Sequence, residues 1–323
     1  MPNCTVKEFQ LIECYFSNRG PTRRDVKLGI GDDCALVQPA ENKSIAISCD
    51  TLVENVHFFP DMPPAALGYK ALAVNLSDLA AMGAEPAWMT LALTLPEVDE
   101  TWLSGFSEGL FEAADYYGIA LIGGDTTRGP RAINITVHGQ VPQGKALTRH
   151  GAKAGDWIYV TGTLGDSALG LDIIRGAQQA SAENKAFLVN RHYCPTPRVL
   201  AGQALRSLAS SAIDLSDGLI SDISHILKAA AVGAIVDVNC IPLSQAMRET
   251  VSEEQALGYA LTGGEDYELL FTVPESQKGA LETTLNHTGT KFVRVGQICA
   301  GSKLKLQLNG EPFTPPYYGF EHF

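Results

Sequence analysis

Five short segments of this chain share one pattern, in which an apolar run is followed by glycine or another small residue and then by aspartate. They are GIGDD (29–33), ISCD (47–50), LIGGD (121–125), IDLSDG (213–218) and LTGGED (261–266). A short apolar run of this kind predicts a strand, and glycine at its end allows a tight turn that presents a carboxylate at the edge of a sheet. The pattern therefore predicts strands ending in acidic turns.

Each acidic turn, taken alone, has an ordinary structural explanation. Asp32 and Asp33 could shape a turn, Asp125 could be a turn aspartate, and 214–218 could cap the helix predicted over 219–230. Five such turns in one chain are better explained if their carboxylates converge, which their mutual repulsion permits only around a cation. Oxygen ligands of this kind suit Mg²⁺, which also binds substrate phosphates. The turns therefore point to phosphate chemistry.

The segment 65–82 reads AALGYKALAVNLSDLAAM and is apolar almost all round, which predicts a buried helix. Asn75 and Asp78 stand three residues apart on one face of it. An ionised carboxylate in such surroundings costs on the order of several kcal/mol unless it is paired or metal-bound. A salt bridge to a lysine or arginine from elsewhere is one explanation. A metal ligand is favoured, because the acidic turns could share the ion.

Composition excludes several classes of protein. At 323 residues, with 45% hydrophobic and 19% charged residues, the chain can form two domains, and its net charge of −12 argues against a nucleic-acid or anionic-membrane surface. Seven cysteines without C-x-x-C spacing indicate neither a zinc site nor a disulfide framework. No signal-peptide pattern and no apolar stretch of about 18 residues is found. We expect a cytoplasmic protein with no membrane partner.

Two domains are predicted, 1–150 and 151–323, with a boundary at the KAGD turn of 153–156. For the first, hydrophobic periodicity predicts helices and strands that together suggest an α+β sandwich. The helices are 6–16, 64–82 and about 100–117, and the strands are 44–48, 88–95, 119–122 and 133–141.

For the second domain we expect a strand at 157–160 and then a helix at 167–175 with Asp166 as its N-cap. The polar stretch 178–185 is predicted as a loop or helix end. Further helices are expected at 198–209 and 219–230, and strands at 235–238, 268–273, 291–298, 303–308 and 311–313.

The remaining candidates are ambiguous. The stretch GGEDYE (263–268) leaves open whether Glu265 faces a ligand and whether Asp266 and Glu268 are merely solvated. His57, just beyond Asp50, is on general grounds more often a packed histidine than a ligand. Signature motifs of protein kinases and serine hydrolases are absent from the sequence.

The strings GIGDDCA, AVNLSDLAAMGAEP, IGGDTTRG, DLSDGL and GGEDYEL, in this order and at these separations, resemble the thiamine-monophosphate kinase family. The resemblance runs from near Phe9 to Phe323. It implies the two-domain fold of aminoimidazole-ribonucleotide synthetase, with an α+β N-terminal domain that forms a homodimer and carries most metal ligands. An α/β C-terminal domain would cover the active site. The implied activity is the ATP- and Mg²⁺-dependent phosphorylation of thiamine monophosphate to thiamine diphosphate.

The resemblance also implies roles for individual residues. Those matching metal ligands for several Mg²⁺ ions are Asp33, Ser48, Asp50, Asp78, Asp125, Asp214 and Asp217. Those matching ATP contacts are Gly124, Asp125, Arg149 and Ser216, and those matching thiamine-side contacts are His57, Glu265 and Tyr317. No covalent catalytic residue is expected. Asp78 and Arg149 are the electrostatic candidates in a direct in-line transfer.

Two positions depart from the family pattern: Tyr317 stands where relatives often have tryptophan, and Cys49 where threonine is common. Two other functions remain open. One is a different ATP-dependent activity on the same scaffold, such as ring closure or selenide activation. The other is a non-catalytic protein that binds nucleotides or divalent cations.

Overall fold

The computed structural model describes residues 8–315, and these divide into two compact units. Unit 1 contains residues up to 79 together with 84–144, and unit 2 contains 80–83 and the chain from 145 onward. Within residues 8–315, no helix combines the length and the apolar character needed to cross a membrane.

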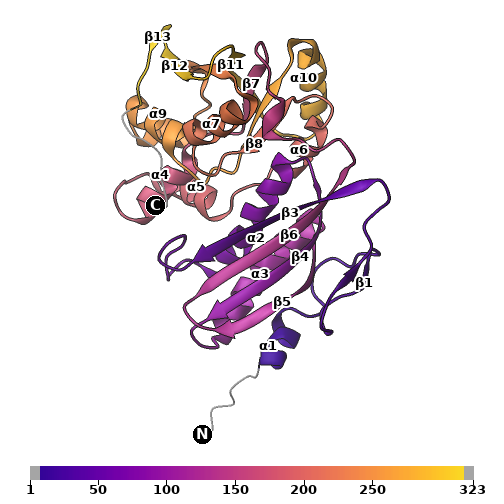
Figure 1. The fold of residues 1–323 in the computed structure, drawn as a ribbon. Helices are drawn as coiled ribbons and strands as arrows, with labels where there is room; N and C mark the ends of the chain where they lie inside the picture. Colours follow the sequence, from indigo (N-terminus) through magenta and orange to yellow (C-terminus); the bar gives the residue numbers. More distant parts are fainter. Residues whose placement is uncertain (1–7, 316–323) are drawn as a thin grey trace. The chain divides into compact units, whose positions relative to one another are not determined.

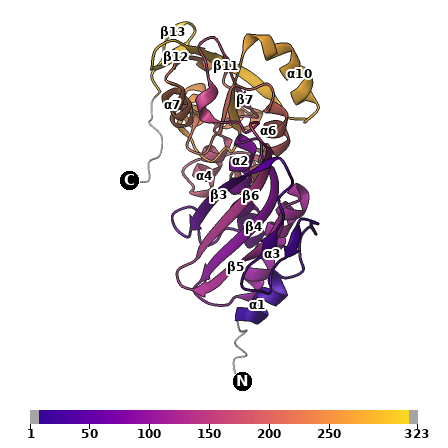
Figure 2. The same ribbon diagram turned by 45° about the vertical axis from the view of Figure 1, so that its right-hand side comes forward.

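Unit 1 is built on a four-stranded sheet in the order β3-β6-β4-β5. Helices α2 and α3 lie on one face of this sheet (Figures 1 and 2). The elements of the unit are α1 (Glu8–Tyr15), β1 (Val26–Leu28), β2 (Leu36–Val37), β3 (Lys43–Val53), α2 (Pro64–Ala81), β4 (Glu85–Leu95), α3 (Glu100–Tyr117), β5 (Ala120–Arg128) and β6 (Ala132–Pro142). Strand β3 is an edge strand and pairs with β6 over its whole length.

Helix α2 is the buried helix that its sequence predicts, since from Leu67 to Ala81 only Tyr69 and Asp78 are partly exposed. It approaches α3 closely enough that their backbones nearly touch. A Cβ atom added at Gly68 would lie 2.0 Å from the carbonyl oxygen of Phe106, and one at Gly109 would lie 1.8 Å from that of Ala65. Glycine is therefore required at both positions, and the contact fixes where α2 lies.

Unit 2 is built on a seven-stranded mixed sheet in the order β13-β12-β9-β11-β7-β10-β8, in which only the β12–β9 pair is parallel. Its strands are β7 (Trp157–Thr161), β8 (Ser211–Asp214), β9 (Gly233–Asp237), β10 (Leu269–Val273), β11 (Phe292–Cys299), β12 (Leu304–Leu308) and β13 (Glu311–Pro312). Its helices are α4 (Asp166–Ile174), α5 (Ala182–Tyr193), α6 (Val199–Leu205), α7 (Leu219–Ala230), α8 (Gln245–Thr250), α9 (Glu253–Thr262) and α10 (Lys278–Asn286), with short 3-10 turns at Arg149–Gly151, Val238–Cys240 and Glu275–Gln277.

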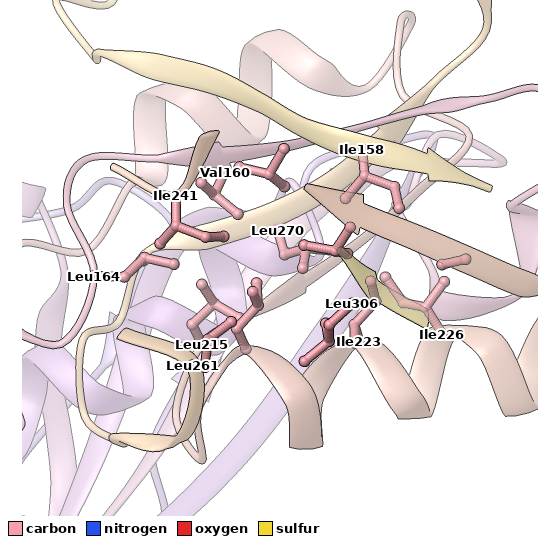
Figure 3. Close-up of a cluster of buried hydrophobic side chains, with 14 of the residues drawn as sticks. Ile158, Val160, Leu164, Leu215, Ile223, Ile226, Ile241, Leu261, Leu270 and Leu306 are labelled. Atoms are coloured by element: carbon pink, nitrogen blue, oxygen red, sulfur yellow. The ribbon is translucent and has the colours of Figure 1, made fainter. Parts of the chain in front are cut away.

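The largest apolar cluster described in unit 2 lies between α7 and the sheet. Ile223 and Ile226 project from α7 toward Leu270 of β10 and Leu306 of β12 (Figure 3). An apolar stripe on one side of α7 therefore anchors it, and with it the acidic turn at its N-terminus.

The predicted fold class is confirmed, and α3 and α7 begin and end where the sequence predicts. Several expectations are wrong. Asp50 and Asp125 lie inside β3 and β5 rather than at strand ends, and the LTGGED segment begins with the last two residues of helix α9 rather than with a strand. Gly165, not Asp166, is the N-cap of α4. Helix α6 ends at Leu205 rather than at 209. The stretch 178–185, predicted as a loop or helix end, contains the start of helix α5, which begins at Ala182 and continues to Tyr193.

Candidate functional site

In unit 1, the alternation of β3 turns Ser48 and Asp50 toward α2. The Ser48 hydroxyl donates to the Asp78 carboxylate. Asn75, one turn earlier on α2, accepts the Asp50 backbone N–H at 3.0 Å through its side-chain oxygen and donates to the Ala71 carbonyl at 3.0 Å. The buried polar face of α2 thus fixes this part of β3, and the two carboxylates share one small region.

The electrostatics of this region favour a bound cation. Burial, and secondly the negative charge of Asp78, raise the pKa of Asp50 to about 6. A hydroxyl and two carboxylates that repel each other form an oxygen donor set of the kind that suits Mg²⁺. Among residues 8–315, however, no group of three or more Asp, Glu, His or Cys side chains is placed to share one metal ion. The residues fit an ion that takes its remaining ligands from water and phosphate.

Other predicted ligands in unit 1 are not brought to this region. Asp33 is exposed in a turn, where its backbone N–H donates to the Asp32 carboxylate at 2.8 Å. The pairing register places Asp125 in line with Ala92, Asn134 and Thr51, on the sheet face opposite to that of Asp50.

Cys49 also lies on this opposite face. Asn134 and Thr136 of β6 contact its sulfur, with Thr136 Oγ1 at 3.3 Å. Cys49 therefore faces away from Asp78, and the cysteine found where threonine is common does not alter the side-chain oxygens beside Asp78. It alters the open face of the sheet, which is the face opposite to α2 and α3.

Local contacts restrict the ring tautomer of His57 and the residue type at Gly124. The Nδ1 atom of His57 accepts the Val53 backbone N–H at 3.0 Å, so in the neutral ring the proton is on Nε2, which is then a donor. Gly124 has φ 152°, and a Cβ atom there would lie 1.8 Å from the Leu91 carbonyl oxygen. Only glycine fits this position, as the GGD motif requires.

In unit 2, β8 and β10 run side by side, and this brings two of the acidic segments together. The Glu265 backbone N–H donates to the Ser216 carbonyl at 2.7 Å, and the Tyr267 N–H donates to that of Leu215 at 2.9 Å. Asp214, the last residue of β8, is buried, whereas Asp217 in the following turn is exposed. The predicted residues Asp214, Ser216, Asp217 and Glu265 are thus neighbours.

Asp222 is a buried carboxylate that the sequence reasoning did not select. It accepts the backbone N–H groups of Asp217 and Gly218, both at 3.1 Å, and so holds the acidic turn at the start of α7. Burial is the largest influence on it and raises its pKa to about 7, while the positive charge of Arg149 opposes that rise. Arg149 is therefore close to this turn. An aspartate within the apolar stripe of α7 was the signal available in the sequence.

The GGEDYE segment is more ordered than a solvated loop. Asp266 is 3% exposed and accepts the backbone N–H of Gly165 at 2.6 Å, whereas Glu268 is fully buried. Arg198 donates to both Glu268 oxygens at 2.6 Å, and Arg191 adds a bond of 3.0 Å. The question that the sequence leaves open is thereby answered: neither Asp266 nor Glu268 is merely solvated, and both bind partners that lie far away in the sequence.

Comparison with known proteins identifies these domains. They are those of AIR synthase related proteins: the N-terminal domain model matches residues 31–141 and the C-terminal domain model matches 153–309. The chain is 58% identical over 318 residues to the thiamine-monophosphate kinase of Escherichia coli K12, with 98% of each chain covered. The chain belongs to the thiamine-monophosphate kinase family.

Solved structures agree with this. The crystal structure of thiamine-monophosphate kinase from Stenotrophomonas maltophilia K279a has a TM-score of 0.84 and 46% identity, covering 90% of this chain and 93% of that one. AaThiL complexed with AMPPCP and TMP has a TM-score of 0.78 and 29% identity, covering 88% and 89%. The predicted substrate contact Tyr317 lies outside the described residues.

Proposed function

We propose that this protein phosphorylates thiamine monophosphate to thiamine diphosphate with ATP, by direct in-line transfer assisted by several Mg²⁺ ions. The near full-length identity with thiamine-monophosphate kinases carries the proposal. Support also comes from AaThiL, which binds an ATP analogue together with TMP.

The residues proposed to hold Mg²⁺ are Asp33, Ser48, Asp50, Asp78, Asp125, Asp214 and Asp217. When bound, Mg²⁺ would offset the charge of two phosphate groups that have to approach each other. The paired carboxylates of Asp50 and Asp78 support this role, because they repel each other in the absence of a cation.

Gly124, Asp125, Arg149 and Ser216 are the proposed ATP contacts, and His57, Glu265 and Tyr317 the proposed thiamine contacts. Arg149 would supply a fixed positive charge to the transferred phosphoryl group. Glu265 would offer a negative charge to the cationic thiazolium ring. A phosphate monoester is already largely ionised near neutral pH, so the reaction needs no strong general base.

A coupled assay tests the activity. The protein is incubated with ATP, Mg²⁺ and thiamine monophosphate, and thiamine diphosphate is measured. Formation of the diphosphate supports the proposal, and its absence refutes it. ADP released only with another acceptor would indicate a different activity of the same fold, and ATP binding without turnover would indicate a non-catalytic binding protein.

A second experiment tests the direct transfer. The enzyme is mixed with γ-labelled ATP and Mg²⁺ without thiamine monophosphate, then quenched in denaturant. We expect no label on the protein, because the clustered aspartates are assigned to metal and are thereby poor nucleophiles. Stoichiometric label that chases into thiamine diphosphate would refute a direct mechanism.

We also propose a homodimer formed through the open face of the unit 1 sheet. Ile47 is 64% exposed and Ile45 is 36% exposed on this face of the edge strand β3. Asp125 shares the face, so pairing would bring an acidic group of one copy to its partner. Sedimentation of Ile47→Lys should show a monomer where the unaltered protein is a dimer; a monomeric unaltered protein would refute this.

The proposed location is the cytoplasm. Free thiols are found at Cys14, Cys34, Cys49, Cys240 and Cys299, which suits a reducing compartment.

A further inference from the structure

Glu265 projects from a loop whose backbone is strained. Glu265 has φ 65° and Tyr267 has φ 52°, both in the left-handed region that non-glycine residues rarely adopt. Such conformations persist only where the surroundings determine them. Here Asp266 and Glu268, which alternate with the strained residues, are both buried and hydrogen-bonded. The loop is therefore held in a single conformation that leaves the Glu265 side chain 28% exposed.

The side chain of Glu265 has a buried neighbour. Its Oε2 atom lies 3.4 Å from Nδ1 of His192, a residue near the end of α5 that is 4% exposed. The same Nδ1 atom lies 3.0 Å from the hydroxyl oxygen of Ser167, which is 1% exposed. Ser167 is the second residue of α4, and its backbone N–H donates to Asp266 at 3.3 Å.

The two contacts meet on one nitrogen of the ring, Nδ1. A carboxylate beside Nδ1 favours a proton on that atom and disfavours a lone pair there. With the proton on Nδ1, the ring donates toward Ser167, whose hydroxyl accepts, and presents its positive edge to Glu265. The chain Ser167–His192–Glu265 thus links the start of α4 to the carboxylate proposed to meet the thiazolium ring.

We infer that His192 is a positioning residue for substrate binding: held by Ser167, it fixes the orientation of the Glu265 carboxylate toward a cationic ligand. This role rests on the proposed function, in particular on Glu265 as a thiamine-side contact. The role depends on contacts among three side chains, of which those of Ser167 and His192 are buried. Neither Ser167 nor His192 is needed to contact substrate.

The test compares KM for thiamine monophosphate with KM for ATP. His192→Leu should raise the first roughly tenfold, the order expected when a charged group loses a hydrogen-bonding partner, and change the second less than about twofold. His192→Asn places an amide N–H near the position of Nδ1 and should restore most of the loss, whereas His192→Gln reaches the position of Nε2 and should not. His287→Leu, a change at an exposed histidine of the same unit, is the control.

A double variant separates positioning from a general structural effect. Glu265→Gln alone should raise KM for thiamine monophosphate, and adding His192→Leu should raise it no further, because the residue through which His192 acts has already lost its charge. Additive effects, equal losses for both substrates, or no difference between the Asn and Gln variants would overturn the inference. If His192→Leu does not fold, the Asn and Gln variants in both backgrounds give the same answer.

The outcomes also distinguish this inference from the proposed function. An unaltered protein that makes no thiamine diphosphate refutes the function itself. An active protein in which Glu265→Gln leaves KM for thiamine monophosphate unchanged refutes the role of Glu265 and, with it, that of His192. If the protein is active and Glu265→Gln raises KM for thiamine monophosphate but His192→Leu does not, the inference about His192 is overturned and the proposed function stands.

Discussion

Replacing Glu268 by glutamine removes a buried negative charge that two arginines share. Glu268 is fully enclosed, and the Arg191 and Arg198 side chains are 12% and 21% exposed, so water screens these pairs only weakly. The neighbouring arginines hold the pKa of Glu268 below its usual range, although burial alone would raise it. Breaking a buried ion pair from one side costs about 3–5 kcal/mol.

The size of a glutamine does not compensate for the lost charge. Arg198 donates to both Glu268 oxygens, and the amide –NH₂ of a glutamine would oppose one of those donors. We expect Glu268→Gln to lower the free energy of unfolding by about 3 kcal/mol, the low end of the range, because the arginines can turn toward water. For a unit of this size that corresponds to roughly 6–12 °C in Tm.

Urea denaturation followed by circular dichroism measures this loss. Glu249→Gln is a matched control, because Glu249 is an exposed carboxylate of the same unit that accepts bonds from Gln245 and Asn184. The control should leave the urea midpoint unchanged. If Glu268→Gln lowers the free energy of unfolding by less than about 1 kcal/mol, the size typical of a surface pair, the buried charge is not required for stability.

Three further predictions follow from the two units. Asp78→Asn should reduce turnover on the order of a thousandfold without loss of stability, because it removes a charge from the proposed metal site; near-normal activity would make Asp78 structural. Burial raises the pKa of Asp266 from 3.8 to about 8, so its contribution to stability should decrease as the pH rises from about 4 to 8. Relative to Asp266→Asn, the free energy of unfolding of the unaltered protein should fall over that window, and a rise would contradict the assigned direction. Gly124→Ala should cost at least about 2 kcal/mol in urea unfolding, whereas Gly123→Ala, where a Cβ meets nothing within 4 Å, should be tolerated; equal effects would contradict the steric argument.

The sequence predicts those elements whose signals are local. Helix α3 has its cap Asp99 before it and the left-handed Gly118 after it, and both bounds were predicted. The apolar character of α2 likewise predicts a buried helix. Strand β3 was predicted too short, because its length depends on pairing with β6, which lies about ninety residues away in the chain.

The same limit applies to the candidate site. Motif resemblance selected Glu265, yet the burial of Glu268 could not be predicted, because Arg198 lies 70 residues away. Asp50 and Asp78 meet because a strand faces a helix, and Asp125 turns away because of the register of three strand pairs. Their placement follows from tertiary packing, for which spacing along the chain gives no signal.

The glycines between α2 and α3 have a practical consequence for engineering heat tolerance. Exchanging helical glycine for alanine is a standard route to a more stable protein, because it reduces the entropy of the unfolded chain. At Gly68 and Gly109 that exchange would force the two helices apart, since an added methyl would overlap a backbone carbonyl. The displaced helix carries Asp78. A thermostabilisation campaign that treats all helical glycines alike would therefore displace the proposed metal ligand Asp78 by changing residues that do not contact it.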